Sequence, residues 1–166
     1  MVTRTLLRTV VLPATPAEVW QVIGGFGAFP DWHPHLLPSV IEDGADPETP
    51  GAVRAFTYEG RVVLRERLLA KDPAAHAYHY SVEAPAFPIR GYEATLLVRP
   101  HEDGAEVRWQ GTYEAETDDA VAQVEQAFGE GTYATGLAAL SERFARWRDR
   151  LTGALADPPE KMTRTG

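Results

Sequence analysis

The chain has 166 residues, 44% hydrophobic and 24% charged, a balance typical of one globular domain that buries a substantial core. Its formal net charge of -8 argues against nucleic acids and anionic membrane surfaces as partners, because both attract basic proteins. The sequence contains no cysteine, which excludes disulfide bonds, thiolate nucleophiles and cysteine-based metal sites.

The N-terminal segment predicts a strand followed by a helical corner. Residues 3–12 are rich in β-branched and aliphatic residues and stop at Pro13. Thr15 is a suitable N-cap, Pro16 fits the first helical turn, and Glu18 is favourable near the positive end of the helix dipole. The buried stripe of this helix is expected to comprise Val19, Trp20, Val22 and Ile23. A glycine pair ends the helix, and the segment AFPDWH predicts a second short helix or turn.

No apolar run in the sequence approaches the roughly 20 residues that a membrane-spanning helix needs. Polar residues also interrupt the apolar ones in MVTRTLLRTVVLPATP, where a signal peptide needs an unbroken core. We therefore expect no membrane insertion and a cytoplasmic location.

Residues 38–116 predict an antiparallel meander, because short runs of strand-forming residues alternate with turn signals such as EDGADPETPG, KDPAAH and HEDGA. Strands are expected at residues 53–59, 61–70, 77–83, 92–100 and 105–116. Alternation places one set of side chains on a single face of the sheet: Tyr92, Ala94, Leu96, Val98, Val107, Trp109, Gly111 and Tyr113. We expect this face to be dry and the opposite face to carry cross-strand charge pairs in water.

The C-terminal third predicts a long helix, capped by Asp118 and Asp119, that runs to about residue 152. Its apolar positions recur at three- and four-residue spacing and require an apolar surface beneath them: Val121, Val124, Phe128, Leu137, Leu140, Phe144, Trp147 and Leu151. Glycines at 129, 131 and 136 indicate a kink or a close approach of the helix backbone to the residues beneath. We expect residues 1–152 to form a single domain and residues 153–166 to form a flexible tail.

This order of elements resembles the START-like superfamily (SRPBCC) and, within it, the bacterial polyketide cyclase/dehydrase-type family. The resemblance spans residues 5 to about 145 and is carried by PATPAEVWQVIGGFGAFPDWHP, RERLLAKD, YEATLLVRP and AEVRWQGTYEA. It implies an α+β helix-grip fold, in which a curved seven-stranded antiparallel sheet wraps around the long C-terminal helix and two short helices follow the first strand. It also implies an internal cavity that holds a hydrophobic small molecule.

Further site residues follow from the same resemblance. The segments are similar to the plant abscisic-acid receptors, which close over a small apolar acid, and whose pocket positions correspond to Glu66, Tyr80, Tyr92 and Tyr113. In this fold the helical corner stands at the open end of the cavity, so its aromatic residues either wall the mouth or simply plug the sheet: Phe26, Phe29, Trp32 and His33. Six other residues are expected to contact the ligand: Leu64, Ala94, Trp109, Phe128, Tyr133 and Leu137.

The candidate catalytic residues are Glu66, Tyr92 and Tyr113. Glu66 shares its strand face with Val62, Leu64 and Leu68, and a carboxylate on a dry face is costly unless it is paired. It is therefore either an acid or base with a perturbed pKa, or a group paired to a tyrosine or to water that orients the ligand. The two phenols can donate a proton at a developing enolate, or they can serve only as amphipathic wall residues.

Other kinds of chemistry find little support in the sequence. His33 and His35 flank Pro34, but no third ligand follows at a characteristic spacing, so we expect no metal and no cofactor. We expect the protein to be a monomer or a homodimer. Two functions stay open. One is a polyketide cyclase/dehydratase-like enzyme acting on an aromatic or poly-carbonyl intermediate, and the other is a non-catalytic carrier or sensor of a hydrophobic ligand.

Overall fold

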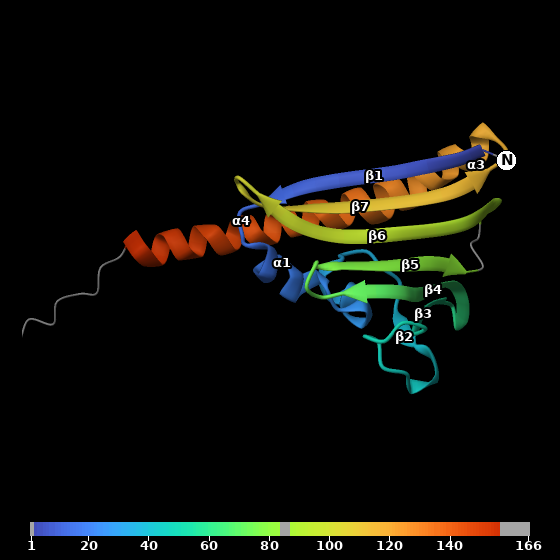
Figure 1. Cartoon of the computed structure of the whole chain (residues 1–166), viewed down its shortest axis with the longest axis horizontal. Helices are drawn as coiled ribbons and strands as arrows, with labels where there is room; N and C mark the ends of the chain where they lie inside the picture. The colour runs from blue at the N-terminus through green and yellow to red at the C-terminus, as the bar shows by residue number, and fades with distance from the viewer. Residues whose placement is uncertain (1, 84–86, 157–166) are drawn as a thin grey trace, which may run out of the picture.

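Seven antiparallel strands, counted over the described residues 2–83 and 87–156, form one curved sheet in the order β1-β7-β6-β5-β4-β3-β2 (Figure 1). The computed structural model places the strands at Val2–Leu12 (β1), Ser39–Ile41 (β2), Val53–Tyr58 (β3), Arg61–Asp72 (β4), Ala77–Glu83 (β5), Ile89–His101 (β6) and Gly104–Ala115 (β7). Six of them lie where the sequence pattern predicts a strand. The seventh is the short β2, at a position where the pattern predicts none. The α+β helix-grip fold is therefore the fold observed.

The side-chain alternation predicted for β6 and β7 is confirmed. Trp109 is 0% exposed and Tyr92 is 1% exposed, so both lie on the inner, dry face of the sheet. The prediction was wrong for Val62, which is 53% exposed. The reason is a register shift between Phe56 and Thr57, which pairs Val62 with Thr57 and turns it toward the outer face.

Three such register shifts bend the sheet around the helix. They lie between Phe56 and Thr57 in β3, between Leu68 and Ala70 in β4, and between Arg90 and Glu93 in β6. Gly91, within the last of them, has a φ of 62°, which glycine adopts without strain. Because bulges increase the local twist and bend a strand, the inner face becomes concave and encloses the helix.

The helical corner between β1 and β2 forms where its sequence predicts, although of the expected buried stripe only Val19 and Ile23 are buried, whereas Trp20 and Val22 are half-buried. Helix α1 (Pro16–Ile23) begins with a capping box, in which the Glu18 amide donates to Thr15 Oγ1 at 3.2 Å and the Thr15 amide donates to Glu18 Oε2 at 3.0 Å. A 3₁₀ turn (η1, Phe26–Ala28) and the short helix α2 (Phe29–Trp32) follow. A second 3₁₀ turn, η2, spans Glu42–Gly44.

The long C-terminal helical segment consists of α3 (Asp118–Val124), the π-helix η3 (Glu125–Ala134) and α4 (Thr135–Ala156). Thr117, rather than the predicted aspartates, caps it, because its Oγ1 accepts from the Ala120 amide at 3.1 Å. Helix α4 continues past the predicted end at residue 152, and residues 157–166 of the expected tail lie outside the described residues. Within residues 2–83 and 87–156, no helix is long and apolar enough to cross a membrane.

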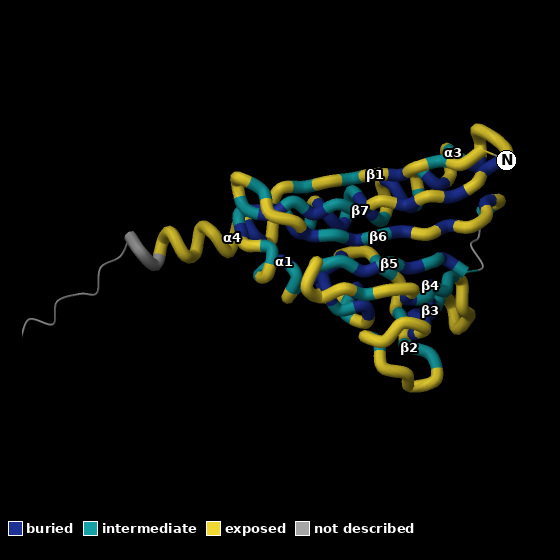
Figure 2. The backbone as a smooth tube through the Cα atoms, in the orientation of Figure 1, coloured by how far each residue is buried: buried dark blue, intermediate teal, exposed yellow. Residues whose placement is uncertain are grey.

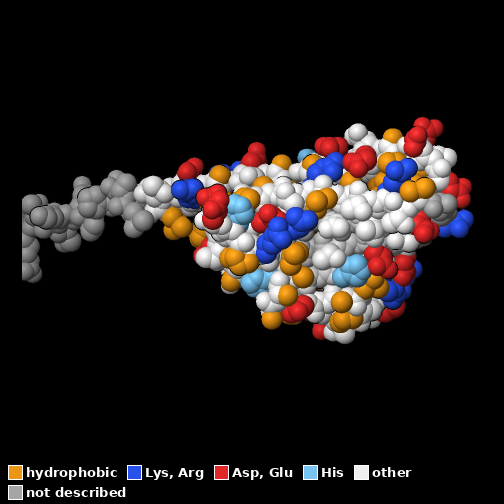
Figure 3. Space-filling view, turned by 45° about the horizontal axis from the view of Figure 1, so that its top comes forward, with side chains coloured by type: hydrophobic (Ala, Val, Ile, Leu, Met, Phe, Trp, Pro, Cys, Tyr) orange, Lys and Arg blue, Asp and Glu red, His pale blue; other side chains and the backbone are white. Residues whose placement is uncertain are grey.

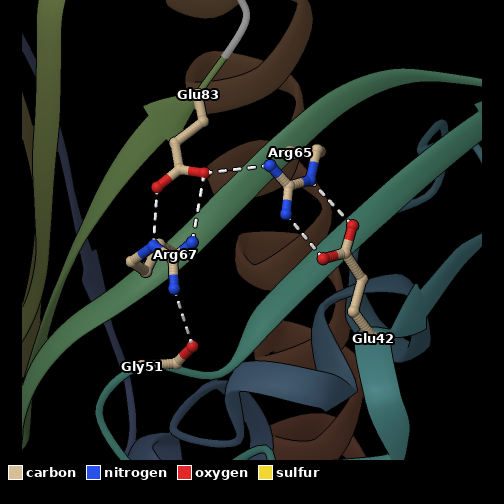
Figure 4. A network of polar contacts seen from close by, with 5 residues as sticks. All are labelled: Glu42, Gly51, Arg65, Arg67 and Glu83. Atoms are coloured by element: carbon tan, nitrogen blue, oxygen red, sulfur yellow. Dashed lines mark hydrogen bonds and ion pairs between the residues drawn. The ribbon is translucent and has the colours of Figure 1, made fainter.

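The outer face of the sheet carries the charge pairs expected of a solvated face. Arg65 Nε and Nη2 donate to the two oxygens of Glu42 at 2.7 and 2.6 Å, and Arg67 Nε donates to Glu83 at 2.6 Å (Figure 4). Arg65 Nη1 also donates to Glu83 at 3.1 Å, which joins the two pairs into one network. Along most strands buried residues alternate with less buried ones (Figure 2). In β3, Val53 and Ala55 are buried as well, although their cross-strand partners are Arg67 and Arg65 of the outer face.

Candidate functional site

A cavity of about 250 Å³ lies between strands β3 and β4, the π-helix η3 and the segment that follows α2. It is lined by Phe29, His35, Leu36, Leu37, Phe56, Leu64, Glu66, Ala127, Phe128, Gly131 and Thr132. Among these described lining residues Glu66 is the one carboxylate. A larger groove of about 510 Å³ lies between α1 and α4 and includes no described residue of the sheet. The smaller cavity, which lies between the sheet and the helical segment, is therefore the candidate ligand site.

Glu66 forms a buried ion pair with Arg54. The two residues are direct cross-strand partners on β3 and β4, and Arg54 Nε donates to Glu66 Oε2 at 2.5 Å. Their side chains are 1% and 5% exposed, respectively. The partner of Glu66 is thus an arginine and not the predicted tyrosine or water. A buried carboxylate is stable only when it is paired in this way.

Aromatic rings and a backbone carbonyl hold the Arg54 guanidinium in place. Its Cζ lies 4.1 Å from the ring centre of Phe26, 4.4 Å from that of Phe29 and 5.0 Å from that of Tyr80. Nη1 donates to the carbonyl of Phe26 at 2.9 Å. Within the described part of the chain Nη2 is buried with no hydrogen-bond partner. The ring faces attract the cation and keep Arg54 pointing at Glu66.

Burial and mutual attraction have opposite effects on the pKa values of this pair. Burial by itself lowers the pKa of Arg54, but attraction to Glu66 together with the contributions of Tyr78 and Tyr80 outweighs this effect, and the net pKa is raised. Burial also raises the pKa of Glu66, and the neighbouring guanidinium opposes that rise. A charged arginine at 2.5 Å favours the ionised carboxylate, so the cavity wall presents a carboxylate whose charge is already neutralised.

His33 connects the helical corner to the π-helix. Its Nε2 lies 2.8 Å from the carbonyl of Thr132, and its Nδ1 accepts from the His35 amide at 3.2 Å. These two bonds require a proton on Nε2 and none on Nδ1, which defines a neutral tautomer. Burial lowers the pKa of His33 and favours the same neutral form. Gly136 permits this contact, because a Cβ there would lie 2.8 Å from His33 Cδ2.

The inner tyrosines bond to each other and to a tryptophan. Tyr92 and Tyr133 share a hydrogen bond between their hydroxyls, and Trp109 Nε1 donates to the Tyr80 hydroxyl at 3.0 Å. Burial raises the pKa of Tyr80, Tyr92 and Tyr133, so all three stay protonated at neutral pH. The ring of Tyr113 stacks on that of Tyr92 at 6.0 Å between centres. These phenols are therefore structural partners within the packed core.

The structure brings four of the predicted site residues together at the cavity: Phe29, Leu64, Glu66 and Phe128. The other predicted residues are buried between the sheet and the helices and do not line it: Phe26, Trp32, His33, Tyr80, Tyr92, Ala94, Trp109, Tyr113, Tyr133 and Leu137. Of these, Phe26 and Tyr80 contact Arg54, and His33 contacts the π-helix at Thr132. Phe26, Tyr80 and His33 therefore support the cavity wall indirectly, through Arg54 and Thr132.

Sequence reasoning missed one central residue, Arg54. Its strand alternates so that Arg54 shares a face with Phe56, an obvious core residue, and this parity predicts that Arg54 is buried without indicating which residue it meets. Seven residues that line the cavity were also missed. Phe56 lies in β3, and the other six lie in irregular or π-helical segments, where no simple periodicity applies: His35, Leu36, Leu37, Ala127, Gly131 and Thr132. Over the described residues no cluster of three His, Asp or Glu side chains is arranged to hold a metal ion.

Several solved structures share this fold. A Thermobifida fusca protein, solved by solution NMR, is 36% identical, with 86% of this chain and 93% of that chain covered and a TM-score of 0.78. The protein XoxI from Bacillus cereus is 27% identical, with 89% and 99% covered and a TM-score of 0.70. Norcoclaurine synthase from Thalictrum flavum, in complex with dopamine and hydroxybenzaldehyde, is 17% identical, with 87% and 88% covered and a TM-score of 0.68. At that identity it shows the common fold alone.

The sequence also matches the model of a protein family. The model described as polyketide cyclase / dehydrase and lipid transport matches residues 3–145, most of the chain. A search of curated proteins finds no match.

Proposed function

Because this chain belongs to the polyketide cyclase / dehydrase and lipid transport family, we propose that it binds a small hydrophobic molecule in the cavity beside Glu66 and does not convert it chemically. The cavity volume of about 250 Å³ is small for a ligand site, since such sites commonly measure about 300–1,000 Å³. The volume favours a ligand with one or two rings, such as an aromatic or a short polyketide-like molecule. The apolar walls supply its binding energy.

The observation that carries this proposal is the ion pair of Glu66 with Arg54 in a wall that is otherwise mainly apolar. The carboxylate is a strong hydrogen-bond acceptor, but its charge is already balanced. A cationic ligand would therefore add an unbalanced charge to an apolar site, which is costly. A neutral ligand with one hydroxyl donor, such as a phenol, would gain a charge-assisted hydrogen bond without that cost.

The same arrangement disfavours acid–base catalysis. An ionised carboxylate bonded to a guanidinium is a weak base and has no proton to donate. The hydroxyls of Tyr92 and Tyr133 bond to each other, and neither residue is among those that line the cavity. A carrier or sensor role can leave the Arg54–Glu66 ion pair and the Tyr92–Tyr133 hydrogen bond intact, whereas acid–base catalysis would require at least one of them to break.

The enzymatic alternative has one specific observation in its favour, namely that burial raises the pKa of Glu66. If a ligand displaced Arg54 from the carboxylate, Glu66 would be able to take up and return a proton during cyclisation or dehydration. This alternative is tested by incubating the protein with a short poly-β-carbonyl thioester and following loss of water by mass spectrometry. Turnover that Glu66→Gln abolishes while binding persists would replace the carrier role with the enzymatic one.

The binding proposal is tested with two fluorescent probes of similar shape, 2-naphthol and 2-methoxynaphthalene, of which only the first has a donor. We expect 2-naphthol to bind roughly 10- to 100-fold more tightly, the value of a hydrogen bond to a charged group. Replacing both members of the ion pair, as in Arg54→Met/Glu66→Leu, should remove this preference and keep the binding of 2-methoxynaphthalene.

A pair of matched variants locates the site. Ala127 lines the cavity, so Ala127→Phe should fill part of it and weaken both probes by at least roughly tenfold. Ala138 is exposed on α4, and Ala138→Phe is the control that should bind both probes like the parent. Equal affinity of the two probes for the parent, or unchanged binding by Ala127→Phe, would refute the proposal.

A further inference from the structure

The groove of about 510 Å³ between α1 and α4 is separate from the cavity beside Glu66. It is lined by Glu18, Gln21, Val22, Arg143, Phe144, Arg146, Trp147 and Arg150. Helix α4 extends beyond the sheet at this end, and its outer part is exposed (Figures 1 and 2). The groove therefore continues onto a helix surface that the other described residues, within 2–83 and 87–156, leave exposed.

One apolar stripe runs from the core onto this exposed part of α4. Leu137, Leu140 and Phe144 are buried at 3%, 0% and 5% exposure, whereas Trp147 and Leu151, which continue the same three- and four-residue spacing, are 36% and 47% exposed. Such spacing places all five side chains along one side of the helix. The buried half of the stripe packs on the domain, and the exposed half is shaped to pack on another helix.

Arginines flank the exposed half of the stripe. Arg143, Arg146, Arg148 and Arg150 lie within eight residues of a chain whose net charge is -8. No ion pair involves any of these four arginines within the described residues 2–83 and 87–156. Basic, acidic and apolar side chains lie next to one another near this end of α4 (Figure 3), and the groove itself is lined by three arginines and one glutamate. The surface is thus a local basic and apolar patch on an acidic protein.

We propose that this groove and the outer part of α4 bind an acidic amphipathic helix of another protein. Such a helix would place its apolar residues against Trp147 and Leu151, and its Glu or Asp residues beside the arginines. A second copy of α4 fits poorly, because pairing two such helices in either direction sets arginine against arginine. A bilayer also fits poorly, because the surface is a groove with Glu18 on its α1 wall and the rest of the protein is acidic.

The test uses two designed helical peptides with leucine at the stripe positions, one with glutamate and one with lysine at the flanking positions. In fluorescence anisotropy at low salt, the parent protein should bind the glutamate peptide at least roughly tenfold more tightly than the lysine peptide. Trp147→Ala should weaken the glutamate peptide by a similar factor. Arg143→Glu/Arg146→Glu/Arg150→Glu should reverse the preference, while Arg61→Glu, an exposed control on β4, should keep it.

Several results would overturn the inference. The first is equal binding of the two peptides, and the second is a triple variant that keeps the preference of the parent. The third is a concentration-dependent dimer that Trp147→Ala abolishes, because it would assign the stripe to a second copy of the chain. Binding to phosphatidylserine vesicles without binding to either peptide would assign it to a membrane. The 2-naphthol titration, repeated on each variant, should be unchanged, so failure here is distinct from failure of the ligand-binding proposal.

Discussion

Arg54 and Glu66 lie directly opposite each other on β3 and β4, buried from solvent, with Arg54 Nε 2.5 Å from Glu66 Oε2. Each charge is stable in the interior only because the other is present. Glu66 also lines the cavity. A change to this pair should therefore affect both the stability of the domain and the polarity of the cavity wall.

Removing one member of this pair should be severe. Glu66→Gln leaves the Arg54 charge buried without its counter-ion, and we expect a loss of about 3–5 kcal/mol in the free energy of unfolding, measured by urea denaturation. Arg54→Met should cost a similar amount. The double variant Arg54→Met/Glu66→Leu removes both charges and should lie within about 1–2 kcal/mol of the parent. Additive losses in the double variant would contradict this coupling.

The outer-face network gives the matched comparison. Glu83 bonds Arg65 and Arg67, but its side chain is 33% exposed and water can replace these contacts (Figure 4). We expect Glu83→Gln to cost no more than about 1 kcal/mol, and the cost to shrink in high salt. If Glu83→Gln reduced the free energy of unfolding as much as Glu66→Gln, burial would not determine how much these ion pairs contribute to stability.

Stability should decrease in mild acid because of His33. Burial lowers its pKa in the folded protein below the ordinary value of about 6.5 in the unfolded chain. The unfolded state therefore binds the proton more readily, so the contribution of His33 is complete above about pH 6.5 and is lost as the pH falls through the folded-state pKa. Thermal unfolding between pH 7.5 and 5 measures the effect.

The variant His33→Gln isolates this contribution. Glutamine keeps a donor for the Thr132 carbonyl but does not titrate, so the decrease in melting temperature toward pH 5 should be smaller than in the parent. His101→Gln, at the β6–β7 hairpin, is the control and should retain the decrease of the parent. A parent-like decrease in His33→Gln would show that other groups cause the acid sensitivity.

Gly111 makes room for the hydroxyl pair of Tyr92 and Tyr133. A Cβ at this position would lie 2.7 Å from the Tyr133 oxygen and 2.8 Å from the Tyr92 oxygen. We expect Gly111→Ala to cost about 1–3 kcal/mol of stability through overpacking, measured by urea denaturation. Adding Tyr133→Phe, which removes one of the crowded oxygens, should recover part of this loss. Gly153→Ala, where a Cβ meets no atom within 4 Å, is the control and should not destabilise.

The sequence predicted much of the site's framework but only part of the site. Alternation alone places Glu66 on the dry face, and Phe29, Leu64 and Phe128, which the resemblance suggests as ligand contacts, line the cavity. The tyrosines were expected to face a ligand, whereas the hydroxyls of Tyr92 and Tyr133 bond to each other. Alternation gives the face of a side chain, but it does not say which groups on that face meet across the fold.

The amino-acid sequence by itself determined the order of the helices and of all the strands except β2, the dry face of the sheet and the N-cap at Thr15, because these depend on spacing within a few residues of the chain. The tertiary structure decided the pairing of Arg54 with Glu66, the π-helical form of Glu125–Ala134 and the contact of His33 with Thr132. Register shifts within strands and packing between distant segments set these features. Local periodicity carries no information about either, because both depend on which segments meet when the sheet closes around the helix.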